Sequence, residues 1–356
     1  VMQAQHGFSI LDDRQDFTYG IDIFRTRPET EGTINGAWET EDDIDEWGVY
    51  LQSKTALSPK LDLVLAGRVD DHSMLPEKVI SPRAGLVLKP NEEQSFRVTY
   101  NRAFSTPTSL NFFLDIPAGL APNESLAALG FTVRAFGTGK DGYSFLNPDG
   151  TLQGMKSPFA PGQTLPISPM VMWPMAIGVL QAQGLVDAPT AALLGSLDPS
   201  AVEVMMLSAI TGARSPLSAA ATQVPDVPGV LESYTETFEV GWQGLLGNQL
   251  ALTADVYYTK KNDFTSPLII QNPLLLLRGE DVGAMLQVQA GPILVQQYMQ
   301  AGLSLEQAQA QAAATITALA EGIGQIPLGV ASSDGIPSQG ADLIVTYRNV
   351  GDVDYW

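Results

Sequence analysis

The sequence predicts an all-β protein: part of an antiparallel, up-and-down transmembrane β-barrel with two very long, partly helical extracellular loops. Three observations favour this fold. Several segments alternate between apolar and polar side chains with a period of two. They run for about nine to twelve residues, which is the length a tilted strand needs to cross a hydrocarbon layer. Short and long connections between them strictly alternate along the chain.

The strands are located by their alternation. In the clearest of them, Leu61, Leu63 and Leu65 share one face, while Asp62 and Arg68 lie on the other. Most of the others join into hairpins through turns rich in glycine, proline and polar residues. The expected strands cover residues 16–24, 46–56, 61–70, 83–88, 96–101, 235–246, 250–258 and 341–349.

The connections differ between the two edges of the sheet. Three hairpin turns are short, at residues 57–59, 89–93 and 247–248. The other connections lie at the opposite edge, and they are the moderate links 27–44 and 72–79 and the very long segments 105–234 and 261–340. Outer-membrane barrels separate short periplasmic turns from long extracellular loops in this way, whereas a soluble sandwich has no reason to do so.

The two long loops carry folding signals of their own. The first contains 14 of the 24 prolines and apolar stretches expected to be helical at 172–185, 190–197 and 201–210. In the second, Ser304 and Gln307 form a capping box that opens an alanine-rich helix ending near Gly322. We expect small helical caps over one end of the barrel. Because the helices lack lysine and arginine, amphipathic membrane segments are the less favoured alternative.

Composition argues against several classes of function. The 39 acidic residues outnumber the 19 basic ones, and the net charge of -20 repels nucleic acid, so no nucleic-acid partner is expected. The chain has no cysteine, and its two histidines, His6 and His72, do not accompany a nucleophile elbow. We therefore expect no enzyme, no catalytic residue, no metal site and no cofactor.

Three segments resemble one protein family when they are taken in order. SPRAGLVLKPNEEQSFRVTYNRAFSTPT, residues 81–108, combines a Ser-Pro-Arg opening, a Lys-Pro turn and a Tyr-x-Arg-Ala-Phe-x-x-Pro close. ESYTETFEVGWQGLLGNQLALTADVYYTKKNDF follows at 232–264, and YRNVGDVDYW at 347–356. Together they resemble the TonB-dependent outer-membrane receptors. The resemblance covers most of the strand residues and none of the long loops.

The resemblance implies a twenty-two-stranded barrel closed by an N-terminal plug, with a TonB box upstream. Neither plug nor box is recognisable in the sequence. Asp352 and Asp354 share the face of Trp356, where a terminal strand would be apolar, so we interpret the chain as a middle-to-late barrel fragment. The implied partners are the TonB complex, through the missing N-terminal part, outer-membrane lipid and lipopolysaccharide, and an unidentified small-molecule ligand. The implied location is the outer membrane of a Gram-negative bacterium.

The polar positions of the strands supply the candidate ligand-binding or lumen-lining residues. In a barrel with a wet interior such side chains pair with one another, contact a plug or line a ligand path, and mutual pairing is the favoured interpretation. The set comprises Arg68, Asp70, Arg83, Arg97, Asn101, Glu239, Gln243 and Asp255. Near the long-loop edge, Arg102 either contacts lipid phosphates or makes a simple rim contact.

An acidic cluster carries eight carboxylates between Glu29 and Glu46. This density of oxygen ligands suits calcium, or divalent cations bridging to lipopolysaccharide phosphates, but no Asp-x-Asp-x-Asp-Gly loop is present. A solvated acidic loop is therefore the favoured interpretation.

The predicted function is that of an outer-membrane receptor and transporter for TonB-energised uptake of a scarce siderophore, vitamin, saccharide or peptide. The alternative is a non-transporting outer-membrane barrel whose surface loops bind a partner. A soluble β-rich binding module is a third possibility.

Overall fold

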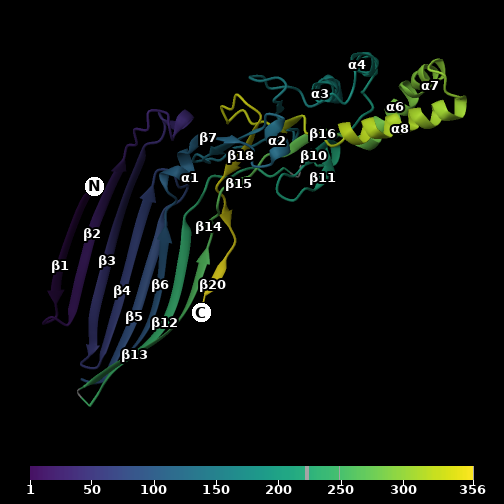
Figure 1. The fold of residues 1–356 in the computed structure, drawn as a ribbon. Helices are drawn as coiled ribbons and strands as arrows, with labels where there is room; N and C mark the ends of the chain where they lie inside the picture. Colours follow the sequence, from purple (N-terminus) through teal and green to yellow (C-terminus); the bar gives the residue numbers. More distant parts are fainter. Residues whose placement is uncertain (221–223, 248, 356) are drawn as a thin grey trace.

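The computed structural model describes residues 1–220, 224–247 and 249–355 and has two parts. Long strands form a twisted nine-stranded sheet, and the helices and shorter strands gather beyond one end of these strands (Figure 1). This second part consists of the insertions 106–232 and 263–352, and we call it the cap. Asn248 and Trp356, for which the sequence predicts a turn and a strand face, lie outside the described residues.

The nine-stranded sheet follows the chain in order. Its neighbouring strands are all antiparallel, and β12 pairs directly with β6 although the first insertion separates them in sequence. The sheet contains β1 (Met2–Ile10), β2 (Gln15–Thr26), β3 (Ile44–Ser58), β4 (Leu61–His72), β5 (Val79–Asn91), β6 (Gln94–Ser105), β12 (Ser233–Leu246), β13 (Leu250–Asn262) and β20 (Val353–Tyr355). The predicted all-β, up-and-down antiparallel arrangement is confirmed.

Connection length separates by edge, as the sequence predicts. Short turns at 11–14, 59–60 and 92–93, and the short step from β12 to β13, alternate with the longer links 27–43, 73–78, 106–232 and 263–352. Strand β1 was not among the expected strands, although Met2, Ala4, Phe8 and Ile10 alternate with polar residues and glycine. It pairs with β2 over its whole length.

Strand register carries the alternation across the sheet and produces two unlike faces. Leu86 pairs with Val98, which pairs with Val240 and then Val256. Side chains in register with this row form the apolar face, and these four residues are 42%, 42%, 46% and 74% exposed, respectively. Positions in register with Arg97 form the polar face. An exposed apolar face of this extent requires a non-aqueous neighbour.

The cap is a mixed structure with its own apolar core. The strands form a five-stranded sheet in the order β11-β10-β16-β17-β9, a four-stranded sheet in the order β15-β18-β8-β7 and a β14-β19 pair. Their bounds are β7 (Asp115–Leu120), β8 (Thr132–Phe136), β9 (Met155–Lys156), β10 (Val204–Leu207), β11 (Arg214–Pro216), β14 (Phe264–Thr265), β15 (Ile269–Ile270), β16 (Leu274–Leu277), β17 (Gly329–Ala331), β18 (Asp342–Thr346) and β19 (Asn349–Val350).

The helices of the cap pack around these small sheets, and three of them form an arm that extends to one side (Figure 1). They are α1 (Ser109–Phe113), α2 (Glu124–Ala128), α3 (Pro169–Ala182), α4 (Ala188–Gly195), α5 (Leu217–Ala220), α6 (Gly279–Gln289), α7 (Gly291–Gln300) and α8 (Leu305–Ile323). The arm consists of α6, α7 and α8. Among the described residues, no helix has the length and hydropathy that a membrane-spanning helix needs.

Some of the cap elements predicted from the sequence are present, and others differ. Helices α3 and α4 lie where the sequence predicts them, and α8 begins after Ser304 with the predicted capping box. The helix expected at 201–210 is wrong, because its apolar run forms β10 and pairs with β16. The strand expected at 341–349 forms as β18, but it belongs to the four-stranded cap sheet. The chain returns to the long sheet only at Val353.

The cap contacts the strand ends on the long-loop side of the sheet through a buried apolar cluster, which we call the seam. Phe112 and Phe113 from α1 are 0% and 1% exposed, and they pack with Ile44, Leu75 and Val79 from the strand ends and links. In the first long link a 3-10 helix (Gly36–Trp38) adds the Trp38 ring, 6.3 Å from that of Phe113. The seam fixes the position of the cap relative to the sheet.

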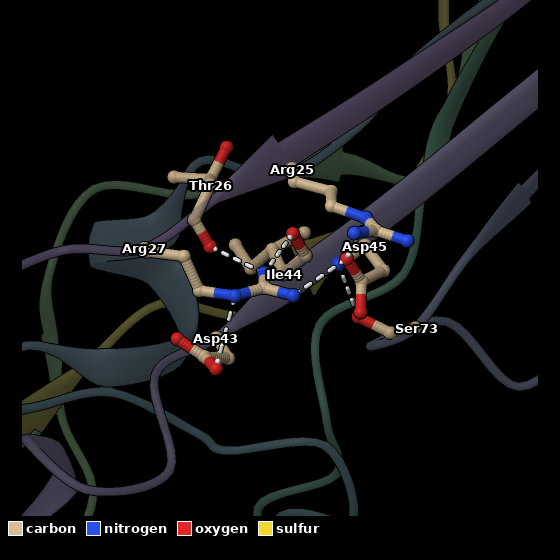
Figure 2. A network of polar contacts seen from close by, with 7 residues as sticks. All are labelled: Arg25, Thr26, Arg27, Asp43, Ile44, Asp45 and Ser73. Atoms are coloured by element: carbon tan, nitrogen blue, oxygen red, sulfur yellow. Dashed lines mark hydrogen bonds and ion pairs between the residues drawn. The ribbon is translucent and has the colours of Figure 1, made fainter. Parts of the chain in front are cut away.

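Polar contacts hold the link between β2 and β3 against the same edge (Figure 2). Arg27 donates from Nη1 to the carbonyl oxygen of Ile44 at 3.0 Å and from Nη2 to Asp45 at 2.7 Å, and its Nε lies 3.1 Å from Asp43. The backbone N–H of Asp45 donates to Ser73 Oγ at 3.1 Å, which connects the neighbouring link. Arg27, which precedes the acidic cluster, thus holds the end of that cluster at 43–45.

Candidate functional site

The polar face of the long sheet contains all eight candidate residues. Their positions follow from register: Arg83 pairs with Asn101, Arg97 lies opposite Gly241, and Gln243 lies opposite Thr253. Two groups of ion pairs account for five of the eight, and the other three make no ion pair among the described residues.

Arg68 on β4 is the centre of the first group. Its Nε donates to both carboxylate oxygens of Asp70, at 2.8 and 2.9 Å, and its Nη1 lies 2.5 Å from Asp22 on β2. Both aspartate side chains are 12% exposed. Gly48 on the intervening β3 provides the space, because a Cβ there would lie 2.2 Å from Arg68 Nη2. The group therefore ties three consecutive strands together.

Besides Asp22, this group contains two more residues that the sequence analysis did not single out, Tyr50 and Gln5. The Arg68 guanidinium lies 5.7 Å from the centre of the Tyr50 ring, and the Tyr50 hydroxyl donates to Gln5 at 2.8 Å. The signal that could have found Asp22, Tyr50 and Gln5 is the same period of two, continued from β4 to the neighbouring strands.

Arg97 on β6 is the centre of the second group. Its Nη2 lies 2.6 Å from Glu239 on β12 and 2.9 Å from Asp255 on β13. A Cβ at Gly241 would lie 2.4 Å from the Asp255 carboxylate, so this glycine leaves room for the contact. The pairs are more open than those of Arg68, with the Arg97 side chain 46% exposed. Charge on the polar face is thus largely balanced between neighbouring strands.

A groove of about 610 Å³ lies along the polar face. Its lining includes Gln5, Tyr50, Arg68, Ser81, Arg83 and Asn101. Arg83 is exposed there and has no ion-pair partner in the part of the chain that the structure describes. The Ser81 hydroxyl is buried without a hydrogen-bond partner. Among the described residues, Arg83 is therefore a charged group of the groove that is left without an ion pair.

Arg102 lies on the apolar face near the long-loop edge. Its guanidinium carbon is 3.9 Å from the centre of the Tyr234 ring, and its Nε is 3.7 Å from Glu236. The rim contact is therefore present, and lipid contact stays a prediction.

The acidic segment is more ordered than a solvated loop. Asp42 is 2% exposed and accepts from Asn35 Nδ2 at 2.6 Å, while Glu39 Oε1 accepts from the backbone N–H groups of Thr30 and Glu31. A hydrogen bond from the Thr30 hydroxyl holds the pKa of Glu39 below its ordinary value. Several of the carboxylates thus stabilise the fold of the link.

His72 has a structural role at the long-loop end of the sheet. His72 accepts from the Met74 backbone N–H at 3.1 Å, lies 3.0 Å from Glu46 and packs against Phe112. Within residues 1–220, 224–247 and 249–355, no group of three or more histidine or acidic side chains is arranged to hold a metal ion.

The geometry defines part of a barrel wall with one lipid-compatible and one polar face. Residues 3–149 match the family model described as TonB dependent receptor-like, beta-barrel. This part of the chain is similar to the barrel of TonB-dependent receptors, in agreement with the resemblance drawn from the motif at 81–108. The later segments 232–264 and 347–356 lie outside the match. A search of curated proteins finds no match.

Solved structures of receptors are similar over much of the chain. The siderophore receptor PirA from Pseudomonas aeruginosa has 9% identity and a TM-score of 0.41, over 99% of this chain and 37% of its own. The FrpB iron transporter from Neisseria meningitidis (F3-3 variant) has 10% identity and a TM-score of 0.32, over 76% and 31%. The alcaligin outer-membrane receptor FauA from Bordetella pertussis has 11% and 0.31, over 75% and 29%. The chain spans only about a third of the length of these proteins.

Proposed function

We propose that the chain forms part of the wall and the surface cap of an outer-membrane receptor that imports a scarce ligand with energy relayed by TonB. The observation that carries the proposal is the division of the sheet into an exposed apolar face and a charge-balanced polar face, within a segment that matches the receptor-barrel family. The apolar face contacts lipid, and the polar face lines the lumen.

The lumen-lining residues divide into two roles in this proposal. Arg68, Asp70, Arg97, Glu239 and Asp255 hold adjacent strands in register through their ion pairs. Arg83, Asn101 and Gln243 remain for a ligand or a plug, and Arg83 is the principal anchor because it makes no ion pair with any described residue. In a chain of net charge -20, an unpaired arginine in a groove favours an anionic group.

The cap lies on the extracellular side in this proposal, which assigns 105–234 and 261–340 to the surface as the sequence predicts. The partners are a small-molecule ligand, the TonB complex through a part outside this chain, and outer-membrane lipid with lipopolysaccharide. The protein resides in the outer membrane of a Gram-negative bacterium and has no catalytic role.

Uptake experiments test this function. The complete reading frame that encodes this chain is expressed in a host without receptors of its own, with and without TonB, and offered labelled siderophores, cobalamin, oligosaccharides and peptides. We expect uptake of one class that requires TonB. Arg83→Gln lowers this uptake, whereas the matched control Arg14→Gln in the 11–14 turn leaves it unchanged.

A non-transporting barrel gives a different result. The cap, with its projecting arm, would then bind a partner at the surface, and ligand would remain outside the cell whether or not TonB is present. Surface binding without TonB-dependent uptake for every class in the panel would overturn the transport proposal in favour of this second function.

A further inference from the structure

An apolar cleft of about 760 Å³ lies on the cap between α2, the end of α3, β10 and β16. Leu274 and Leu343, which are 3% and 1% exposed, lie at its base in a buried cluster, and Leu126 and Leu129 pack against that cluster half-buried. Leu185, after α3, is 64% exposed. The cleft therefore offers apolar surface that is already shaped and remains accessible to water.

The charge of the cleft is opposite to that of the chain. None of its lining residues is acidic, although the chain has 39 acidic residues. Its one cation, Arg214, donates from Nη1 to the carbonyl oxygen of Gly324 at 3.2 Å and from Nη2 to Gln325 Oε1. Both acceptors are neutral, and no described carboxylate forms an ion pair with Arg214. These hydrogen bonds hold its positive charge in place without an ion pair.

We propose that this cleft binds a soluble amphiphile with one acyl chain and one anionic head group. The leucine walls remove the chain from water, which is the main favourable contribution, and the volume lies within the range of small-molecule sites. Arg214 pairs with the head group through charge-assisted hydrogen bonds. The amides of Gln183 and Asn123 are neutral lining groups, so they add no repulsion toward an anion.

The proposal is independent of transport through the sheet. Every residue of the cleft belongs to the cap, and none belongs to the groove that contains Arg83. Failure of TonB-dependent uptake would leave it intact, and failure of amphiphile binding would leave the transport proposal intact.

Photolabelling of the full chain in lipid nanodiscs tests the proposal. The probes are dodecanoate with a diazirine near the chain end, and the alcohol and trimethylammonium compounds with the same chain. We expect dodecanoate to label peptides containing residues 122–129 and 322–327 most strongly, the alcohol more weakly and the ammonium compound least. Unlabelled dodecanoate should suppress this labelling.

Two variants with matched controls locate the binding groups. Arg214→Gln should lower labelling by dodecanoate about fivefold and leave labelling by the alcohol unchanged, since only the charge-assisted contact is lost. The control is Lys156→Gln, a cap cation outside the cleft. Leu185→Glu places a carboxylate on the lining and should lower dodecanoate labelling, whereas Leu305→Glu, at a 53% exposed leucine of the arm, should not.

Either of two kinds of result would overturn the proposal: labelling in the wrong place, or labelling that does not depend on the head group or on Arg214. One is labelling confined to the strands of the long sheet, which reports partition of the probe into the bilayer only. The other is equal labelling of the cleft peptides by the three probes, or a dodecanoate-to-alcohol ratio that Arg214→Gln leaves unchanged while hydrogen exchange shows an intact cap.

Discussion

The cap buries its apolar side chains in a core, whereas the long sheet exposes them on one face. In the cap, Leu275, Leu276 and Leu277 of β16 are 0–1% exposed within a protein core. In the sheet, Leu86 and Leu88 of β5 are 42% and 45% exposed on a continuous apolar face. Leucine is therefore covered by protein in the cap but not in the sheet, where the proposed function has lipid cover it. Such a difference is expected if the sheet is a barrel wall in lipid and the cap lies in water.

The largest expected effect comes from the cap core. Leu275→Ala should lower the free energy of cap unfolding by about 2–5 kcal/mol, because it leaves a cavity among rigid neighbours. Leu86→Ala, the matched change on the apolar face of the sheet, should cost much less because lipid chains fill the space. Hydrogen exchange of cap and sheet peptides in nanodiscs measures both, and equal costs would contradict the comparison.

An arginine introduced on each face in turn tests which face of the sheet meets hydrocarbon. Val98→Arg should destabilise the folded sheet in bilayers by about 2–4 kcal/mol, since the charge faces hydrocarbon. Thr99→Arg, one residue along β6 and on the polar face beside Glu239, should change stability little. Folding into lipid vesicles, followed by urea titration, gives both values. If the two arginines cost the same, the assignment of the faces is wrong.

The two ion-pair groups of the polar face differ in burial, so the loss of their arginines should differ in cost. Arg68→Met leaves Asp22 and Asp70 unpaired where they are 12% exposed and should cost about 2 kcal/mol. Arg97→Met leaves the more open Glu239 and Asp255 and should cost about 1 kcal/mol or less. The same urea titration ranks the two variants, and a reversed order would show that burial does not set the value of these pairs.

The smallest effect concerns the acidic link and pH. The pKa of Glu39 is lowered chiefly by the hydrogen bond from the Thr30 hydroxyl. This contribution to stability is present above the ordinary carboxylate pKa and is lost as pH falls through the lowered value. Amide exchange at Thr30 and Glu31 should accelerate over that acidic range, relative to the intrinsic rate. Glu39→Gln should remove the step, and a step that persists in this variant would assign it to another carboxylate.

Sequence alone determined most of the long sheet, from β2 to β6 and β12 to β13, because its signal is local. The period of two in Leu61–Asp70 fixes which side chains share a face, and connection length fixes which edge they leave from. The pairing of Arg68 and Arg97 with acidic neighbours was expected as a class. The particular partner Asp22 was not, because register between strands brings it to Arg68.

Only the tertiary structure decided the cap. The run Val204–Leu207 is short and apolar, and periodicity cannot distinguish a buried strand from a helix at that length. Strand β18 pairs in parallel with β8, so that Asp342 lies opposite Thr132 across both insertions. No local pattern encodes such a contact, because it depends on two distant segments burying their apolar faces together. The cleft and the free charge of Arg214 arise from the same packing.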